Sequence, residues 1–425
     1  MKRVIAFPAR ILAASWGQAF SALVLLVTIR LFTQELGPEP FGAAMLGLGI
    51  ISLVDGVSTT AYSQSLAQIL KDRPTHERRS LALGMGLWLS AFVGVLCAAG
   101  VVLAGIAYGW QSAAAVALVA PAFCLAEGVR AGGQMIVLLG RRYGVVSSWA
   151  ATEALCIAGA SLAAIRLMDG DPVSLVVGML AGRTISTVLC SQFALGRIDH
   201  WSADRRQARD VIPAAIAFGW PVAVMTPLAW IGIFADRYIV GYSLGLTEAG
   251  VLAALAGAIT RPYGIVSAGL TNVFRPDLLD LAAGRPPAHS RPLLRWAITA
   301  IGIGLAGIAA AAIVGPWLVD FLISFATPQI DERALITLLA ASQMLLLVTH
   351  ALDNQLLALG RSRQMLVVLM IVTALGLPLI AIGALTFGLV GAAAARVLSE
   401  GMKLSGAALL VARARRTTTG GTIAA

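Results

Sequence analysis

Residues 296–319 read WAITAIGIGLAGIAAAAIVGPWLV and contain no charged side chain. An α-helix rises ~1.5 Å per residue, so a run of this length is long enough to cross the ~30 Å hydrocarbon core of a bilayer. Runs of this kind recur along the chain, which is 58% hydrophobic and only 12% charged. A soluble protein of 425 residues would need far more polar surface to cover its cores. The sequence therefore predicts an all-α, polytopic membrane protein.

About twelve transmembrane helices are predicted from these apolar runs, with boundaries good to several residues. The predicted spans are residues 11–33, 41–69, 80–106, 112–139, 145–168, 172–196, 211–241, 247–274, 293–324, 334–359, 363–386 and 388–412. The second and tenth spans carry the most polar side chains. The four cysteines all fall inside spans and form no C-x-x-C pair, so we interpret them as small packing residues.

The basic residues indicate how the chain is oriented. The formal net charge is +10, from 31 Lys and Arg against 21 Asp and Glu. Most of the Lys and Arg residues lie in the two terminal tails and in the loops from even-numbered to odd-numbered spans. With twelve spans these segments share one side of the membrane, and basic loops face the cytoplasm. We therefore expect both termini in the cytoplasm, and we expect no nucleic-acid partner.

The sequence also contains an internal duplication. Residues 36–49 read LGPEPFGAAMLGLG, and residues 244–257 read LGLTEAGVLAALAG. In the same order, LLGRR is followed by ALGRSR near the ends of the fourth and tenth spans. AGRTIS at 181–186 likewise precedes AARVLS at 394–399. Because six spans separate equivalent points, the two halves enter the membrane with the same polarity.

The duplication predicts two tandem, parallel six-helix lobes around a central cavity. The N-terminal lobe is expected at residues 1–196 and the C-terminal lobe at 211–413. The basic, polar residues 197–210 form the predicted cytoplasmic linker, and residues 414–425 form a predicted flexible tail.

Asp55 lies near the centre of the second span, where an ionisable side chain costs roughly 2.5–3.5 kcal/mol to insert. Ser52, Asp55, Thr59 and Tyr62 share one helical face, which indicates contact with a partner helix or with a water-filled cavity. Asp55, Thr59 and Tyr62 are therefore candidate cavity residues. The alternative for Asp55 is a structural ion pair.

Arg261 lies near mid-depth in the eighth span and directly precedes Pro262, which should bend the helix. A guanidinium group is always charged and presents a fork of donors that matches phosphate oxygens. Arg261 is therefore our leading candidate for binding an anionic substrate. The alternative is a salt bridge to Asp55 or Asp236.

Other charged side chains fall inside the spans. Arg30 and the pair Asp236–Arg237 occupy nearly equivalent places in the two repeats, and are candidates both for substrate binding and for snorkelling to the headgroups. The secondary candidates are Arg183, Arg396, Glu400 and His350. For several of these we favour structural pairing: Glu127 with Arg130, Arg183 with Glu153, and a ladder of Arg396, Glu400 and Lys403. For His350 we favour a hydrogen-bonded core role over a proton relay.

No pattern in the sequence predicts an enzyme or a resident cofactor. The chain has no P-loop, no G-x-S-x-G elbow and no H-E-x-x-H, and no metal site is predicted. Without a Walker sequence the protein cannot use ATP itself. We therefore expect any uphill transport to use a gradient of H⁺ or Na⁺, or the removal of product.

Three stretches carry a resemblance to a known family: TIRLFTQELGPEPFGAAML at 28–46, DRYIVGYSLGLTEAGVLAAL at 236–255 and QLLALGRSR at 355–363. They resemble polysaccharide-biosynthesis flippases, the O-antigen and exopolysaccharide exporters of the multidrug/oligosaccharidyl-lipid/polysaccharide superfamily. The resemblance implies a twelve-helix, two-lobed fold in the bacterial inner membrane. It also implies transport of sugar units linked to undecaprenyl pyrophosphate. Lipid II flippases of the same superfamily usually carry two further helices, for which this chain has no room.

The leading hypothesis is a flippase for a lipid-linked oligosaccharide that works by alternating access. Its partners would be membrane lipids, with a polymerase and glycosyltransferases of the same pathway. One alternative is a cation-coupled multidrug exporter of the same superfamily, although arginine is at least as prominent as carboxylate in these spans. A membrane glycan polymerase or ligase is disfavoured, because such enzymes usually carry a long outer loop and the longest one here, around 327–333, is short.

Overall fold

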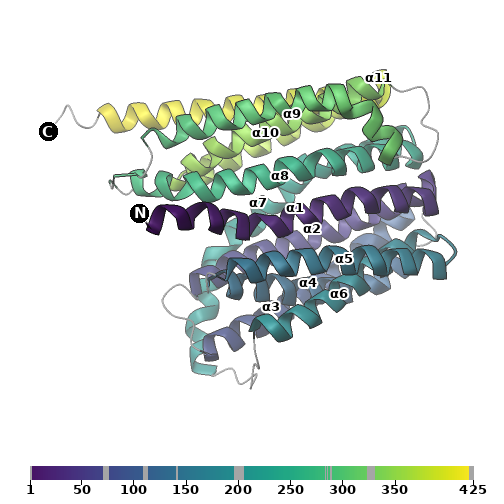
Figure 1. Cartoon of the computed structure of the whole chain (residues 1–425), viewed down its shortest axis with the longest axis horizontal. Coiled ribbons are helices and arrows are strands. Elements are labelled where there is room, and N and C mark those ends of the chain that lie inside the picture. Colours follow the sequence, from purple (N-terminus) through teal and green to yellow (C-terminus); the bar gives the residue numbers. More distant parts are fainter. Residues whose placement is uncertain are drawn as a thin grey trace. The chain divides into compact units, whose positions relative to one another are not determined.

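A computed structural model describes residues 2–69, 76–108, 113–139, 142–195, 205–282, 284, 286–287, 290–322 and 331–420. Over these residues the protein is helical with short turns and contains no strand, which confirms the predicted all-α fold. The helices are α1 (Lys2–Leu36), α2 (Pro38–Ile69), α3 (His76–Tyr108), α4 (Ala113–Leu139), α5 (Tyr143–Leu167), α6 (Pro172–Leu195), α7 (Arg205–Ser243), α8 (Leu246–Ala282), α9 (Pro292–Leu322), α10 (Glu332–Ala358) and α11 (Ser362–Gly420) (Figure 1).

The continuous segment α11 consists of two helices joined at a sharp break. Phe387 and Gly388 have non-helical backbone angles, and Gly388 has a φ of +62°, which a residue with a side chain adopts only with strain. On either side of the break, the backbones of Gly383 and Gly391 pack so closely that neither position has room for a Cβ atom. The break lies where the sequence predicts one span to end and the next to begin. With it counted, the described helices match the predicted spans one to one.

Two helices extend beyond their predicted spans. The seventh, α7, already begins at Arg205, so residues 205–210 of the predicted linker form its first turns. The last helix continues to Gly420, through the first part of the predicted tail. Both extensions are polar, and charged residues at the end of an apolar helix can continue it into the interfacial region without entering hydrocarbon.

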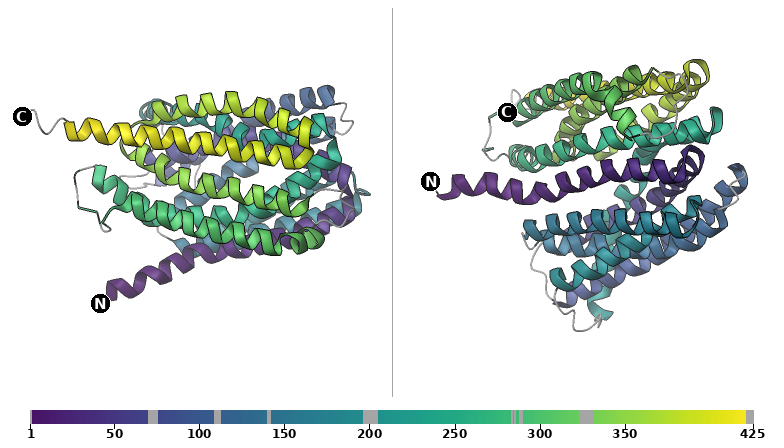
Figure 2. Two further views of the ribbon diagram at one scale, coloured as in Figure 1. Left: turned by 90° about the horizontal axis from the view of Figure 1, so that it is seen from above. Right: turned by 45° about the vertical axis from the view of Figure 1, so that its right-hand side comes forward.

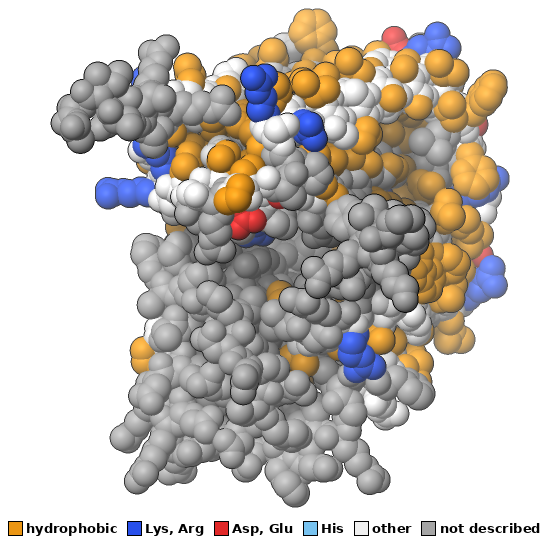
Figure 3. Space-filling model, turned by 60° about the vertical axis from the view of Figure 1, so that its left-hand side comes forward, with side chains coloured by type: hydrophobic (Ala, Val, Ile, Leu, Met, Phe, Trp, Pro, Cys, Tyr) orange, Lys and Arg blue, Asp and Glu red, His pale blue; other side chains and the backbone are white. Residues whose placement is uncertain are grey.

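Nine segments of the described helices are long and apolar enough to cross a membrane, and the longest, Arg363–Ala414, contains both helices of α11. Large apolar side chains such as Trp88, Leu118 and Leu167 are more than four-fifths exposed. Hydrophobic side chains cover much of the described surface on one face, where charged side chains appear only as isolated groups (Figure 3). Such a surface would aggregate in water but is suited to contact with lipid. The protein is a multi-pass membrane protein.

The chain divides into two compact units, Met1–Trp230 and Ile231–Ala425, which we call the N-lobe and the C-lobe. In the N-lobe α2 packs against α3 and α4, α3 against α4, and α4 against α6. In the C-lobe α8 packs against α9 and α10, α9 against α10, and α10 against α11. The two lobes thus repeat one packing order, as expected from the duplicated sequence. Figure 2 gives two further views of the helices. The division falls inside α7, and the lobe limits at 196 and 211 stay predictions.

Small residues bring α5 and α6 together. Gly178 and Gly182 are one turn apart on α6, in a G-x-x-x-G arrangement. A Cβ atom at Gly178 would collide with the backbone of Ser161 on α5, and one at Gly182 with the backbone at Cys156. Helices in lipid gain little from burying apolar area against each other, so van der Waals contact between close backbones holds such pairs together. This contact fixes α6 in the N-lobe and with it the depth of Arg183.

Candidate functional site

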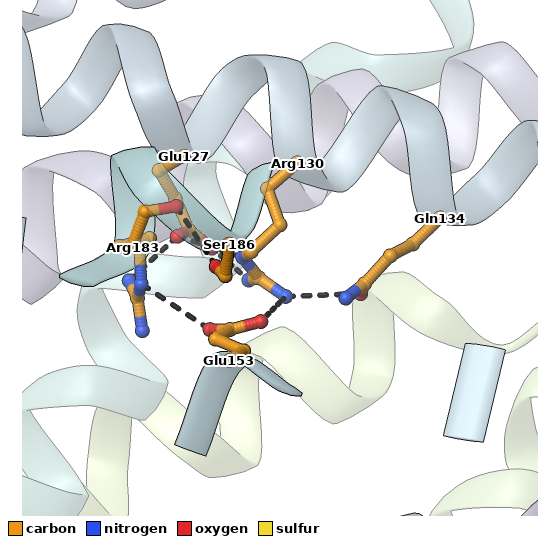
Figure 4. Close-up of polar contacts among 6 residues, drawn as sticks. All are labelled: Glu127, Arg130, Gln134, Glu153, Arg183 and Ser186. Carbon is orange, nitrogen blue, oxygen red and sulfur yellow. Dashed lines mark hydrogen bonds and ion pairs between the residues drawn. The ribbon is translucent and has the colours of Figure 1, made fainter. Parts of the chain in front are cut away.

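Four charged side chains from three helices meet inside the N-lobe. Arg130 of α4 binds Glu127 one turn before it, through Nε at 2.9 Å and through Nη2. Arg183 of α6 places Nη1 at 2.5 Å from Glu127 Oε2 and Nε at 3.3 Å from Glu153 Oε1 of α5. Arg130 Nη1 lies 3.7 Å from Glu153 Oε2, which closes the group (Figure 4). The predicted pairs Glu127–Arg130 and Arg183–Glu153 are confirmed.

The N-lobe cluster is internally balanced. It holds two guanidinium groups and two carboxylates, and each carboxylate oxygen lies within ion-pair distance of a guanidinium. Arg130 also donates to Gln134 Oε1 at 2.9 Å (Figure 4). Arg183 lies over the Phe123 ring at 5.1 Å. Buried charges are tolerated when they are paired and hydrogen-bonded in this way. The cluster therefore ties α4, α5 and α6 together and offers no unoccupied carboxylate oxygen to a ligand.

The C-lobe contains a second buried ion pair, between α7 and the last helix. Arg396 Nη1 donates to Asp236 Oδ2 at 2.5 Å and to the Ile233 carbonyl at 3.3 Å. The other oxygen of Asp236 accepts from the backbone N–H of Arg237 at 2.9 Å. Both side chains of the pair are only 4% exposed. Asp236, for which the sequence offered Arg261 as a partner, is paired instead with Arg396.

Arg237 and Glu400 lie beside this pair. The guanidinium of Arg237 is buried and sits 4.6 Å from the centre of the Phe234 ring, a cation–π contact. Glu400 is one turn beyond Arg396 and interacts electrostatically with Arg396 and Lys403, as the predicted ladder requires. The structure thus gathers four site candidates of the C-lobe: Asp236, Arg237, Arg396 and Glu400.

His350 of α10 has a hydrogen-bonded partner on a neighbouring helix. Its Nδ1 lies 2.7 Å from the hydroxyl of Ser267 on α8, and its carbonyl accepts from Asn354. This is the core role that the sequence favoured for the histidine. His350 also interacts electrostatically with Lys403 of the last helix, so it lies within reach of the charged group around Glu400.

Arg261 differs from the other C-lobe candidates because its side chain is exposed. On α8 the preceding stretch is almost wholly buried, from Ala249 at 1% to Ala258 at 2% exposed. Arg261 and Pro262 then both lie on the surface, and α8 continues through Pro262 to Ala282. An exposed cation in the middle of a membrane-spanning helix must face water or a polar ligand rather than hydrocarbon. The predicted bend at Pro262 stays a prediction.

The remaining candidates lie in the N-lobe. Thr59 and Tyr62 of α2 are buried, and the Tyr62 ring fills the space over Gly86 of α3. Part of the polar stripe therefore packs against a partner helix. Arg30 lies in α1 and is half-buried, apart from the N-lobe cluster. Asp55 is on α2, and its side chain lies outside the described residues.

Sequence reasoning missed several contacts at these sites, including the ion pairs Arg183–Glu127, Arg130–Glu153 and Arg396–Asp236. The rings of Phe123 and Phe234 lie under Arg183 and Arg237. Phe234 is three residues before Arg237, and this spacing on a helix could have signalled the contact. Nothing in the sequence points to Ser267 as the partner of His350. Among the described residues no group of three or more His, Cys, Asp or Glu side chains could hold a metal ion.

Solved structures share this fold. The lipid II flippase MurJ in an inward closed conformation aligns with a TM-score of 0.74 at 12% identity, covering 93% of this chain and 87% of its own. An inward-facing multidrug resistance MATE family transporter of the MOP superfamily aligns with a TM-score of 0.67 at 16% identity, covering 94% and 96%. A Vibrio cholerae MATE transporter aligns with a TM-score of 0.65 at 14% identity, covering 98% and 99%.

At such identities the likeness is one of fold, and it confirms the predicted two-lobed architecture of membrane helices. No match was found among curated protein sequences. A family model described as polysaccharide biosynthesis protein matches residues 9–279, which is more than half of the chain and includes all of α2 to α7. The chain therefore belongs to the polysaccharide biosynthesis protein family.

Proposed function

We propose that this protein is a flippase that moves polyprenyl-pyrophosphate-linked oligosaccharide units across the bacterial inner membrane by alternating access. The observation that carries the proposal is the family match over residues 9–279. The fold supports it, because a lipid II flippase and several transporters share the architecture. The protein itself would perform no covalent chemistry on its substrate. The product would serve the synthesis of a cell-surface polysaccharide such as O-antigen lipopolysaccharide or exopolysaccharide.

The candidate residues match the chemistry of such a substrate. Its pyrophosphate is anionic, and Arg261 presents an exposed, permanently charged fork of donors in the middle of α8. The polyprenyl tail is apolar and can stay in lipid beside the exposed hydrophobic side chains. Arg237 and Arg396 are buried, so we assign them to the support of the C-lobe rather than to the head group.

The same proposal implies which enzymes act before and after this protein, and what drives transport. Glycosyltransferases must assemble the lipid-linked unit on the cytoplasmic side, and a polymerase or ligase must consume it on the other. The sequence contains no nucleotide-binding motif, so an ion gradient or the removal of product would drive transport.

The second candidate function is a cation-coupled multidrug exporter. It is favoured by the multidrug transporters that share the fold over nearly the whole chain. Such proteins take organic cations, for which an exposed arginine is a poor ligand because like charges repel. The two functions therefore predict opposite charge for the substrate.

Transport by the purified full chain in proteoliposomes separates the two functions. One set of vesicles contains a polyprenyl-pyrophosphate oligosaccharide, and its movement is followed with a membrane-impermeant glycosidase that trims only exposed sugars. The other set contains ethidium, whose efflux is followed by fluorescence. We expect protein-dependent exposure of the sugar and no ethidium efflux, with protein-free vesicles as the control. Ethidium efflux without sugar exposure would assign the multidrug function instead.

We also propose that both termini face the cytoplasm. The concentration of Lys and Arg in the tails and in alternate loops supports this orientation. A phosphatase reporter that is active only outside the cytoplasm should be silent when fused after Ala425 and active when inserted near Gln329. An active reporter at Ala425 together with a silent one at Gln329 would invert the topology.

A further inference from the structure

The two lobes differ in how completely their buried carboxylates are satisfied. In the N-lobe cluster every carboxylate oxygen lies within ion-pair distance of a guanidinium. In the C-lobe the Oε2 atom of Glu400 is buried and has no hydrogen-bond partner among the described residues. The Nε atoms of Arg237 and Arg396 are in the same state, as is that of Arg183 in the N-lobe. A buried carboxylate oxygen without a donor costs free energy, so its presence requires a reason.

Glu400 stands in a row of charged groups inside the C-lobe. Arg396, Glu400 and Lys403 are spaced at i, i+4 and i+7 on one face of the last helix, which covers roughly 10 Å along its axis. From α7, Asp236 reaches the row through Arg396, and Arg237 lies beside Asp236. We call these groups, together with Asp353 and His350 of α10, the C-lobe charge row.

The partners of Glu400 come from each element that packs around it. Its own helix supplies the cations Arg396 and Lys403, and α7 supplies the carboxylate of Asp236. From α10, Asp353 interacts with both Glu400 and Lys403. The neighbouring helical stretch 364–386 contains no charged or histidine residue. The row is balanced when ionised, because Asp236, Asp353 and Glu400 face Arg237, Arg396 and Lys403.

We propose that Glu400 is the proton-binding group of the C-lobe and that it couples a proton gradient to transport. This inference rests on the proposed function of a gradient-driven flippase. A proton from water adds to Oε2, which turns the unsatisfied acceptor into a neutral carboxyl whose hydroxyl can donate, and leaves by the reverse step. Asp353 and Lys403 interact electrostatically with Glu400, and His350 interacts with Lys403, so further titratable groups neighbour the proposed proton site. Chains of such groups inside membrane proteins carry protons.

Protonation of Glu400 can change the contact between α7 and the last helix, because Arg396 interacts with two carboxylates. Its guanidinium binds Asp236 and interacts with Glu400. When Glu400 is neutral, Asp236 alone keeps a full negative charge beside Arg396, and the tie between α7 and the last helix tightens. When the proton leaves, Glu400 competes again and the tie relaxes. The ion pair between Asp236 of α7 and Arg396 of the last helix is therefore stronger when Glu400 is protonated than when it is ionised.

Infrared difference spectroscopy of the purified full chain tests proton binding without any transport substrate. On acidification, the wild type should gain the C=O stretch of a protonated, buried carboxyl group. Glu400→Gln should lose this band, while Glu248→Gln, the same change in the first turn of α8, should keep it. In proteoliposomes Glu400→Gln should also lose the dependence of sugar exposure on an imposed pH gradient.

The outcomes separate this inference from the proposed function. A well-folded Glu400→Gln protein that keeps the band shows that Glu400 does not bind the proton. If that variant fails to accumulate, Glu400→Asp carries the test: it keeps a carboxyl group and should shift the pH at which the band appears, and an unchanged band overturns the inference. The infrared band could depend on Glu400 while the protein moves no lipid-linked sugar. That result would support proton binding by Glu400 and refute the proposed flippase function.

Discussion

Arg396→Ala is expected to destabilise the C-lobe by about 3–5 kcal/mol, because it leaves the carboxylate of Asp236 buried without its cation. The pair is 4% exposed on both sides, so water cannot replace the guanidinium. The same change removes the donor to the Ile233 carbonyl. Thermal unfolding of the purified protein in detergent measures the effect. Arg363→Ala, which removes an exposed arginine at the start of the same segment, should change stability by less than about 0.5 kcal/mol.

The companion variants distinguish an ion pair from general packing. Asp236→Asn should also be destabilising, whereas the double variant Asp236→Leu with Arg396→Met should recover much of the loss, because two apolar side chains leave no buried charge. A double-mutant cycle with Asp236→Ala and Arg396→Ala should give a coupling energy of about 1–3 kcal/mol. Additive effects of the two alanine changes would show that the pair contributes nothing as a pair.

Arg261→Ala is expected to reduce export of the lipid-linked sugar almost to background without loss of folded protein. The side chain is exposed, and its removal takes a charged fork of donors away from the substrate. Arg261→Lys keeps the charge but not the fork, and should retain partial export. The measurement is glycan export by each variant, divided by the amount of folded protein in the membrane.

Arg275→Ala provides the matched control for this series. Arg275 is an exposed arginine on the same helix, four turns further along α8, outside the predicted span. It should export at the wild-type level. A well-folded Arg261→Ala protein with wild-type export would exclude Arg261 from substrate binding. Poor insertion of Arg261→Ala would instead assign the arginine a structural role.

The fold could be predicted because its main determinants are local. Apolar runs long enough to cross a bilayer become helices. No water is available there, so the backbone N–H and C=O groups must hydrogen-bond to each other within each segment. The predicted end of the eleventh span, from the apolar runs, agrees with the break at Gly388, whose positive φ interrupts the helix. The pair Glu127–Arg130 followed from a spacing of three on one helix. The length of α7 was underestimated, because its first turns are polar.

The amino-acid sequence by itself determined that the protein is helical, lies in a membrane, and repeats one six-helix pattern. It also predicts a depth for each charged residue inside a span, because depth follows from position along a helix. Only the tertiary structure decided which charges meet. Arg183 and Arg396 hold equivalent places in the repeated motifs, yet Arg183 binds α4 and α5 whereas Arg396 binds Asp236, 160 positions away on α7. The direction in which a helix turns its charged face depends on packing against its neighbours, which no local pattern contains.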